Sequence, residues 1–94
     1  MGAEVVTYTV LVSQSIWSQA GVPPSFQCRG VTYREILDDA AGQYPPLLPY
    51  VGGGQIPLAA SVVLFADGRQ VEDVTAAVPG PIAELRIVLP SSGG

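Results

Sequence analysis

The residues of this sequence that could do chemistry are few, and most lack the partners that catalysis needs. The 94-residue chain contains no histidine, and its four basic residues are all arginines. Cys28, the single cysteine, has no histidine, lysine or second cysteine near it to lower its pKa. Asp38 and Asp39 are adjacent, so on a helix their side chains diverge and cannot flank one substrate bond. We therefore expect Cys28 to be a buried core thiol and the two aspartates to lie on a solvated helix face.

Two further stretches of small residues also lack the neighbouring residues that an active site would need. Gly52-Gly53-Gly54 is not followed by the Lys-Ser/Thr pair of a phosphate-binding loop, which favours a turn. Ser91 and Ser92 have no histidine in the chain to act as a base. The sequence offers no cluster of histidine, cysteine or carboxylate ligands for a metal. We expect a protein that binds no metal or cofactor of its own and is not itself an enzyme.

The feature that remains is the end of the chain, where Gly93-Gly94 follows a Pro90-Ser91-Ser92 spacer. A terminal carboxylate is ionised at neutral pH and is a poor acyl donor. It becomes reactive when another enzyme gives it a leaving group, for instance by adenylation with ATP. Glycine has no side chain, so two glycines can enter a narrow channel. A frayed end with no chemical role is the alternative interpretation of these residues.

Composition limits the classes of protein to which the chain can belong. Hydrophobic residues make up 48% of the sequence and charged residues 13%, which predicts one folded domain. The formal net charge is −4 and no basic cluster exists, so we expect no nucleic-acid partner. Residues 40–66 are uncharged, but repeated prolines and glycines exclude a membrane helix. With no leader pattern and no internal disulfide, we expect a cytoplasmic protein that is monomeric when free.

The first part of the chain predicts two strands. Residues 4–12 alternate with period two and form the clearest strand, and residues 25–29 form a short one paired antiparallel to it. Residues 13–24 are expected to form a loop with room for one helical turn at Ser15–Gln19, and Trp17 is expected to plug it. The residues expected to share the inward face are Val6, Tyr8, Val10 and Val12 in the first strand and Phe26 and Cys28 in the second.

A helix follows the second strand. Thr32 and Glu35 form a capping box, in which Thr32 caps the Glu35 amide and Glu35 reaches back. Pro45-Pro46 ends the helix, unless Gly42 ends it sooner. Its apolar face is expected to contain Tyr33, Ile36, Leu37, Ala40, Ala41 and Tyr44.

The remaining segments complete a single sheet. Residues 47–59 predict a Pro/Gly loop, residues 60–66 a strand, and Asp67-Gly68 a turn into Arg69–Val71. Residues 74–83 are irregular, and residues 84–89 form the last strand, with Leu85, Ile87 and Leu89 on one face.

One helix can cover one face of such a sheet. If the last strand lies parallel beside the first, the α+β fold is a β-grasp (ubiquitin-like) fold, with a four- to five-stranded mixed sheet packed on one main helix. We expect residues 1–90 to form this domain and residues 91–94 a flexible tail.

Three stretches of the sequence resemble the ThiS/MoaD-type sulfur-carrier family, which includes the small subunits of molybdopterin synthase and the thiazole-type and cysteine-type carriers. Residues 30–44 (GVTYREILDDAAGQY) resemble its Gly-x-Thr helix, which is followed by Tyr-Pro. Residues 62–71 (VVLFADGRQV) resemble its central strand and turn, although the family often has Asn where this chain has Ala66 or Asp67. Residues 85–94 (LRIVLPSSGG) resemble its closing strand, proline, small residues and Gly-Gly.

The resemblance implies a set of partners. An E1-like adenylating enzyme of the MoeB/ThiF type, using ATP and Mg, would activate Gly94. A rhodanese or another persulfide donor would then supply sulfur to form a Gly94 thiocarboxylate. A downstream synthase would pass this sulfur to a cofactor, an amino acid or a secondary metabolite.

Two alternatives share this fold. One is a modifier joined to target lysines, and the other is a β-grasp interaction module with an inert tail. In each case docking is expected on the sheet face away from the helix, where alternation places Thr7, Thr9, Arg86 and Val88. The expected partner-binding residues are Arg86, Val88, Pro90, Ser91, Ser92 and Gly93.

Overall fold

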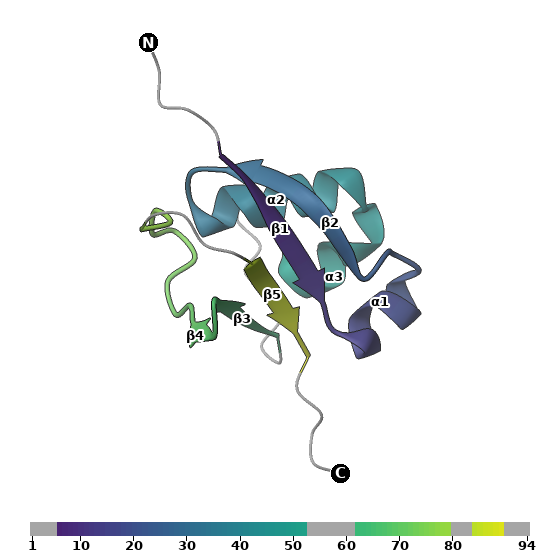
Figure 1. The fold of residues 1–94 in the computed structure, drawn as a ribbon. Helices are drawn as coiled ribbons and strands as arrows, with labels where there is room; N and C mark the ends of the chain where they lie inside the picture. Colours follow the sequence, from purple (N-terminus) through teal and green to yellow (C-terminus); the bar gives the residue numbers. More distant parts are fainter. Residues whose placement is uncertain (1–5, 53–61, 80–83, 90–94) are drawn as a thin grey trace.

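A five-stranded mixed sheet in the order β2-β1-β5-β3-β4 is the framework of the molecule (Figure 1). The computed structural model describes residues 6–52, 62–79 and 84–89. The strands are β1 (Val6–Val12), β2 (Ser25–Gly30), β3 (Val63–Ala66), β4 (Arg69–Gln70) and β5 (Glu84–Val88). Adjacent strands β1 and β5 are parallel, and the other pairs are antiparallel. Helix α2 (Tyr33–Gln43) packs on one face, which confirms the predicted β-grasp fold.

Strand alternation decides which side chains enter the core. Tyr8, Val10 and Val12 of β1 are buried in the core, as are Phe26 and Cys28 of β2. Val6 is an exception to the predicted pattern, since it is 46% exposed. Val6 is the first residue of β1 and pairs with Gly30 of β2, which has no side chain to cover it.

Helix α2 begins where the capping box predicts. The Thr32 hydroxyl accepts a hydrogen bond from the Glu35 amide at 3.1 Å. The Glu35 carboxylate reaches back to the amide of Val31, at 2.7 Å, one residue beyond the cap. The amides of Tyr33 and Arg34 donate to carbonyl oxygens in residues 74–76. The first turn of the helix therefore has partners for its amides.

The other end of α2 agrees with the prediction that the proline pair ends the helix, whereas the loop beyond it departs from the sequence prediction. The helix runs through Gly42 to Gln43, directly before Tyr44 and the proline pair. A 3-10 turn (Pro45–Leu47) leads into the predicted Pro/Gly loop at residues 47–59, and the short helix α3 (Leu48–Val51) occupies the start of that loop. Its remaining part, residues 53–59, lies outside the described residues. The buried side chains of Leu47 and Val51 stabilise these turns from the core side.

The predicted loop between the first two strands is wrong in extent, because Gln14–Ala20 forms the helix α1. No side chain caps its start, but Ile16 is fully buried and Gly21 ends the helix in the left-handed conformation, with φ 72°. Trp17 belongs to this helix and packs, half-buried, against the core, which agrees with its expected role as a plug.

The second half of the sheet follows the sequence prediction closely. Asp67 and Gly68 both have positive φ, 48° and 84°, which is the two-residue hairpin turn that the Asp-Gly pair predicts. Leu85 and Ile87 of β5 are buried, and Leu89 is partly buried beyond the end of this strand. The predicted strand at residues 60–66 is seen from Val63, and residues 60 and 61 lie outside the described part of the chain. No helix in the described residues is long and apolar enough to span a membrane.

Candidate functional site

The junction between β1 and α1 holds the end of β5, just before the glycine-containing tail of the sequence. The Ser13 amide donates to the Ile87 carbonyl at 2.9 Å. The Ser13 hydroxyl accepts from the Leu89 amide at 3.2 Å, and the Ser15 hydroxyl makes a long 3.4 Å contact with the Leu89 carbonyl. The position and direction of the chain are therefore fixed at Leu89.

Five of the predicted site residues follow this point in the sequence. Pro90, Ser91, Ser92, Gly93 and Gly94 lie outside the described residues. The structure therefore describes the strand that leads to them and the hydrogen bonds at its end.

The face of the sheet opposite α2 contains the predicted docking residues. Thr7 and Arg86 are exposed there, and Thr9 and Val88 are half-buried. Alternation along β1 and β5 thus places these four side chains on the open face, as expected. The strand register places Thr9 opposite Glu84 and Arg86 opposite Leu11 on the adjacent strands β1 and β5.

Three apolar residues on this face were missed by the sequence prediction. Arg86 pairs in register with Leu11 on one side and with Phe65 on the other. Val63 pairs with Val88 in the next row. Leu11 has the same parity as Thr7 and Thr9, so alternation could have found it. Val63 and Phe65 depend on the order of the strands, which no local pattern contains. We call Leu11, Val63, Phe65, Arg86 and Val88 the open-face patch.

Arg86 gives the open-face patch its positive charge. Its guanidinium forms an ion pair with the Glu84 carboxylate at 3.0 Å, and the Arg86 side chain is 55% exposed. Exposed ion pairs contribute about 0–1 kcal/mol, so the guanidinium can exchange this partner for another carboxylate at little cost. The patch therefore combines half-buried apolar side chains with one cation, Arg86, that can form an ion pair with a partner's carboxylate.

Cys28 is fully buried on the covered face of the sheet, which confirms the predicted core thiol. Burial, and then the charge of Asp39, raise its pKa from 9.0 to about 12. The thiol is therefore protonated at neutral pH and is a poor nucleophile.

Asp38 and Asp39 diverge as predicted, but only Asp38 lies on an exposed helix face. Asp38 pairs with Arg34 at 3.0 Å. Asp39 instead accepts the Arg29 amide of the edge strand β2 at 2.7 Å. Gln43 donates to the Gln27 carbonyl of the same edge at 2.8 Å. The expected solvated helix face is thus confirmed for Asp38, whereas Asp39 is half-buried because α2 lies close enough to β2 for its side chains to cap the strand edge. Within the described residues no group of His, Cys, Asp and Glu side chains could hold a metal ion.

Comparisons with solved structures identify proteins of the same shape. The crystal structure of small archaeal modifier protein 1 from Haloferax volcanii aligns with a TM-score of 0.78 and 21% identity, covering 95% of this chain and 100% of that one. The solution structure of small archaeal modifier protein 1 from Methanosarcina acetivorans gives 0.75 and 20%, covering 98% and 100%. The Amycolatopsis orientalis BexX/CysO complex gives 0.74 and 21%, covering 93% and 99%.

These similarities extend over nearly the full length of each matched chain, and they establish the β-grasp fold. At the level of sequence, no family model matches the chain, and a search of curated proteins finds no match.

Proposed function

We propose that this protein is a sulfur carrier that acts through its last residue. An E1-like enzyme adenylates the carboxylate of Gly94, a sulfur donor converts it to a thiocarboxylate, and a downstream synthase takes the sulfur into a small molecule. In this proposal the protein is a co-substrate of its partners and is not itself an enzyme. The recipient of the sulfur is a cofactor, an amino acid or a secondary metabolite.

The observation that carries the proposal is the fixed end of β5, which only the Pro90-Ser91-Ser92 spacer separates from the Gly-Gly sequence. The parallel pairing with β1 and the hydrogen bond from the Leu89 amide to Ser13 hold this end. Gly94 is five residues beyond Leu89, so it can reach at most about 17 Å from that point. A partner that binds the domain would therefore have the reacting carboxylate confined to a small volume, which raises its effective concentration.

The chemistry requires two balanced steps in the activating enzyme. The Gly94 carboxylate displaces pyrophosphate from ATP, with Mg²⁺ neutralising the phosphates, and forms an acyl adenylate. Hydrosulfide then attacks the acyl carbon, so that a carbon–sulfur bond forms while the bond to AMP breaks. With a persulfide donor of the rhodanese type, a thiol reductant must also cleave the sulfur–sulfur bond to release the thiocarboxylate.

The open-face patch is the surface that we assign to the activating enzyme. Its apolar side chains become buried on docking, and Arg86 exchanges its exposed ion pair with Glu84 for a carboxylate of the partner. The tail follows the strand that contributes Arg86 and Val88, so one docked surface also determines where Gly94 enters the partner.

Intact-protein mass spectrometry tests the proposal. The protein is incubated with a candidate E1-like enzyme, Mg-ATP and sulfide. We expect a mass increase equal to the replacement of one oxygen by sulfur, and we expect it to disappear when Gly94 is deleted. If several activating enzymes leave the mass of the folded protein unchanged, the carrier function is wrong.

A matched pair of glycine variants tests the narrow channel. Gly94→Ala adds a methyl group at the reacting end, and we expect slower adenylation, measured as pyrophosphate release. Gly42→Ala adds the same group on α2, where a Cβ atom meets nothing within 4 Å, and we expect an unchanged rate. Equal rates for the two variants would contradict the narrow-channel argument.

The second candidate function is that of a protein modifier. We retain this candidate because the two archaeal structural neighbours are named as modifier proteins. Covalent adducts between Gly94 and lysines of other proteins, detected after tryptic digestion, would support a modifier. If removal of Gly93-Gly94 leaves the function of the protein in its cell intact, the tail is inert and the domain is an interaction module.

A further inference from the structure

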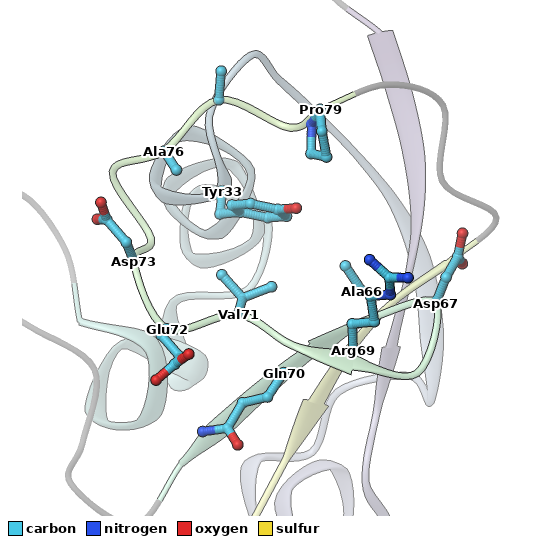
Figure 2. A pocket seen from close by; sticks show the side chains of 11 residues that line it. Tyr33, Ala66, Asp67, Arg69, Gln70, Val71, Glu72, Asp73, Ala76 and Pro79 are labelled. Carbon is cyan, nitrogen blue, oxygen red and sulfur yellow. The ribbon is translucent and has the colours of Figure 1, made fainter.

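A pocket of about 500 Å³ opens beside the β3–β4 turn and the start of α2 (Figure 2). Its walls come from the start of α2, from the β3–β4 turn and from residues 71–79. The Tyr33 ring forms the floor and is only 6% exposed. Figure 2 shows Val71 pointing toward this ring, with Ala76 and Pro79 at its sides. Small-molecule and side-chain sites in proteins have similar volumes and apolar linings.

Backbone hydrogen bonds hold the walls of this pocket in place. The Arg34 amide donates to the Val74 carbonyl at 2.7 Å, and the Tyr33 amide donates to the Ala76 carbonyl at 3.3 Å. On the strand side, the Val71 amide donates to the Leu64 carbonyl at 2.8 Å. These bonds connect the irregular segment to both α2 and the sheet. The pocket is therefore formed before any partner arrives, so binding loses little conformational entropy in ordering its walls.

The charges around the pocket are mostly negative. Asp67, Glu72 and Asp73 lie around it, with Arg69 as the one cation among the lining residues that the structure describes. Hydrogen bonds from Thr75 hold the pKa of Asp73 below its usual value, so this carboxylate stays charged. Figure 2 shows Glu72 directed away from the Tyr33 ring, and this side chain is exposed. The protein as a whole is also acidic, with a net charge of −4, which adds to the attraction for cations.

We propose that this pocket binds a partner protein through one apolar side chain flanked by lysine or arginine. The apolar side chain enters between Tyr33 and Val71, and the flanking cations pair with the carboxylates of Glu72 and Asp73 outside. An acidic segment is disfavoured by the same carboxylates.

The pocket and the start of the tail lie at opposite ends of β5. Asp67 lies beside the first residue of β5, since the Glu84 amide donates to its carboxylate at 3.0 Å. The tail follows Leu89, five residues later, and a strand of that length spans about 17 Å. A partner in this pocket can therefore remain bound while the other end of β5 is engaged. The inference does not depend on the sulfur-carrier proposal.

A nuclear magnetic resonance titration with three capped peptides tests the proposal on the isolated ¹⁵N-labelled protein. The probe is acetyl-Lys-Leu-Lys-amide, for which we expect saturable shifts of the Val71, Glu72 and Ala76 amide signals. Acetyl-Lys-Ser-Lys-amide lacks the apolar side chain, and we expect it to bind at least tenfold more weakly. Acetyl-Glu-Leu-Glu-amide has the reverse charge, and we expect it to bind at least tenfold more weakly as well. Absence of saturable shifts, or equal binding of the acidic peptide, would overturn the proposal.

Variants of the wall locate the binding. Ala76→Trp fills the pocket from an exposed position, and we expect affinity for acetyl-Lys-Leu-Lys-amide to fall more than tenfold. Ala76→Ser keeps the volume open and should bind as the unmodified protein does. Unchanged affinity in folded Ala76→Trp would overturn the assignment.

Glu72→Lys provides a second test that does not depend on how Ala76→Trp folds. Glu72 is exposed, so this variant changes the charge of the rim with little effect on the core. We expect its affinity for the same peptide to be about fivefold weaker. Unchanged affinity would show that the rim carboxylate takes no part in binding.

Discussion

The two faces of the sheet are made from the same strands, yet one face forms the core and the other is available to bind a partner. On the face covered by α2, Val10, Cys28, Leu85 and Ile87 have no exposed surface. On the other face, the open-face patch is half-buried or exposed, with Arg86 in an exposed ion pair. A side chain on the covered face is packed on all sides, so changing it should alter the free energy of unfolding. A side chain on the open face has room for a partner, so changing it should alter binding.

The largest expected effect on stability is on the covered side. Ile36 of α2 is fully buried against the sheet, so Ile36→Ala removes apolar contacts and leaves a cavity. We expect it to lower the free energy of unfolding by about 2–5 kcal/mol. Urea unfolding followed by circular dichroism measures this change. Leu48 is 46% exposed, and Leu48→Ala should cost less than about 1 kcal/mol. Equal costs for the two variants would contradict the burial difference.

Gly30 gives the next largest effect and explains the glycine in the Gly-x-Thr stretch. A Cβ atom at Gly30 would lie 2.7 Å from the Ile36 amide nitrogen, which is backbone of α2 and cannot move aside cheaply. We expect Gly30→Ala to destabilise the fold by about 1–3 kcal/mol.

Gly42→Ala is the matched control for Gly30→Ala, because a Cβ atom at Gly42 on α2 meets nothing within 4 Å. We expect this variant to stabilise the fold by up to about 1 kcal/mol. The two glycine variants should thus shift the urea midpoint in opposite directions, and shifts of the same sign would contradict the close contact at Gly30.

Cys28 should make the covered face sensitive to alkaline pH. In the unfolded chain the thiol ionises near pH 9.0, whereas in the folded protein its pKa is about 12. Between these values the unfolded state binds fewer protons, so stability falls as pH rises. At pH 10 we expect a loss of about 1.4 kcal/mol relative to pH 7.

Cys28→Ala isolates this contribution, because the other titrating groups, including Tyr33, remain in both proteins. We expect the variant to lose less stability than the unmodified protein between pH 7 and pH 10. The same loss in both would show that the thiol does not titrate as described.

The covered face could be predicted from the sequence more fully than the open one. Alternation in β1 and β5 and the Thr32–Glu35 capping box are local patterns, and each appears in the structure. Helix α1 was anticipated only as one possible turn at Ser15–Gln19, because its stability comes from burying Ile16 and not from a cap or a long periodic run. The apolar part of the open-face patch was missed because Phe65 reaches Arg86 only through the order of the strands.

The smallest effect on stability is expected at Arg86, where the proposed function predicts a large effect on binding. Arg86→Glu changes an exposed side chain, so the free energy of unfolding should change by less than about 0.5 kcal/mol. Affinity for the activating enzyme should fall about tenfold or more, because the variant places a like charge against the partner's carboxylate. Surface plasmon resonance with the E1-like enzyme measures this affinity for both the variant and the unmodified protein.

Arg29→Glu is the matched control for Arg86→Glu. Arg29 lies exposed on the same face, but in the edge strand β2, with β1 between it and the strand of Arg86. Both variants change the net charge of the protein equally, so long-range attraction or repulsion affects both equally. Only Arg86 lies in register with the apolar residues Leu11 and Phe65. If Arg29→Glu weakens binding as much as Arg86→Glu does, the enzyme responds to total charge, and the open-face patch is not its docking surface.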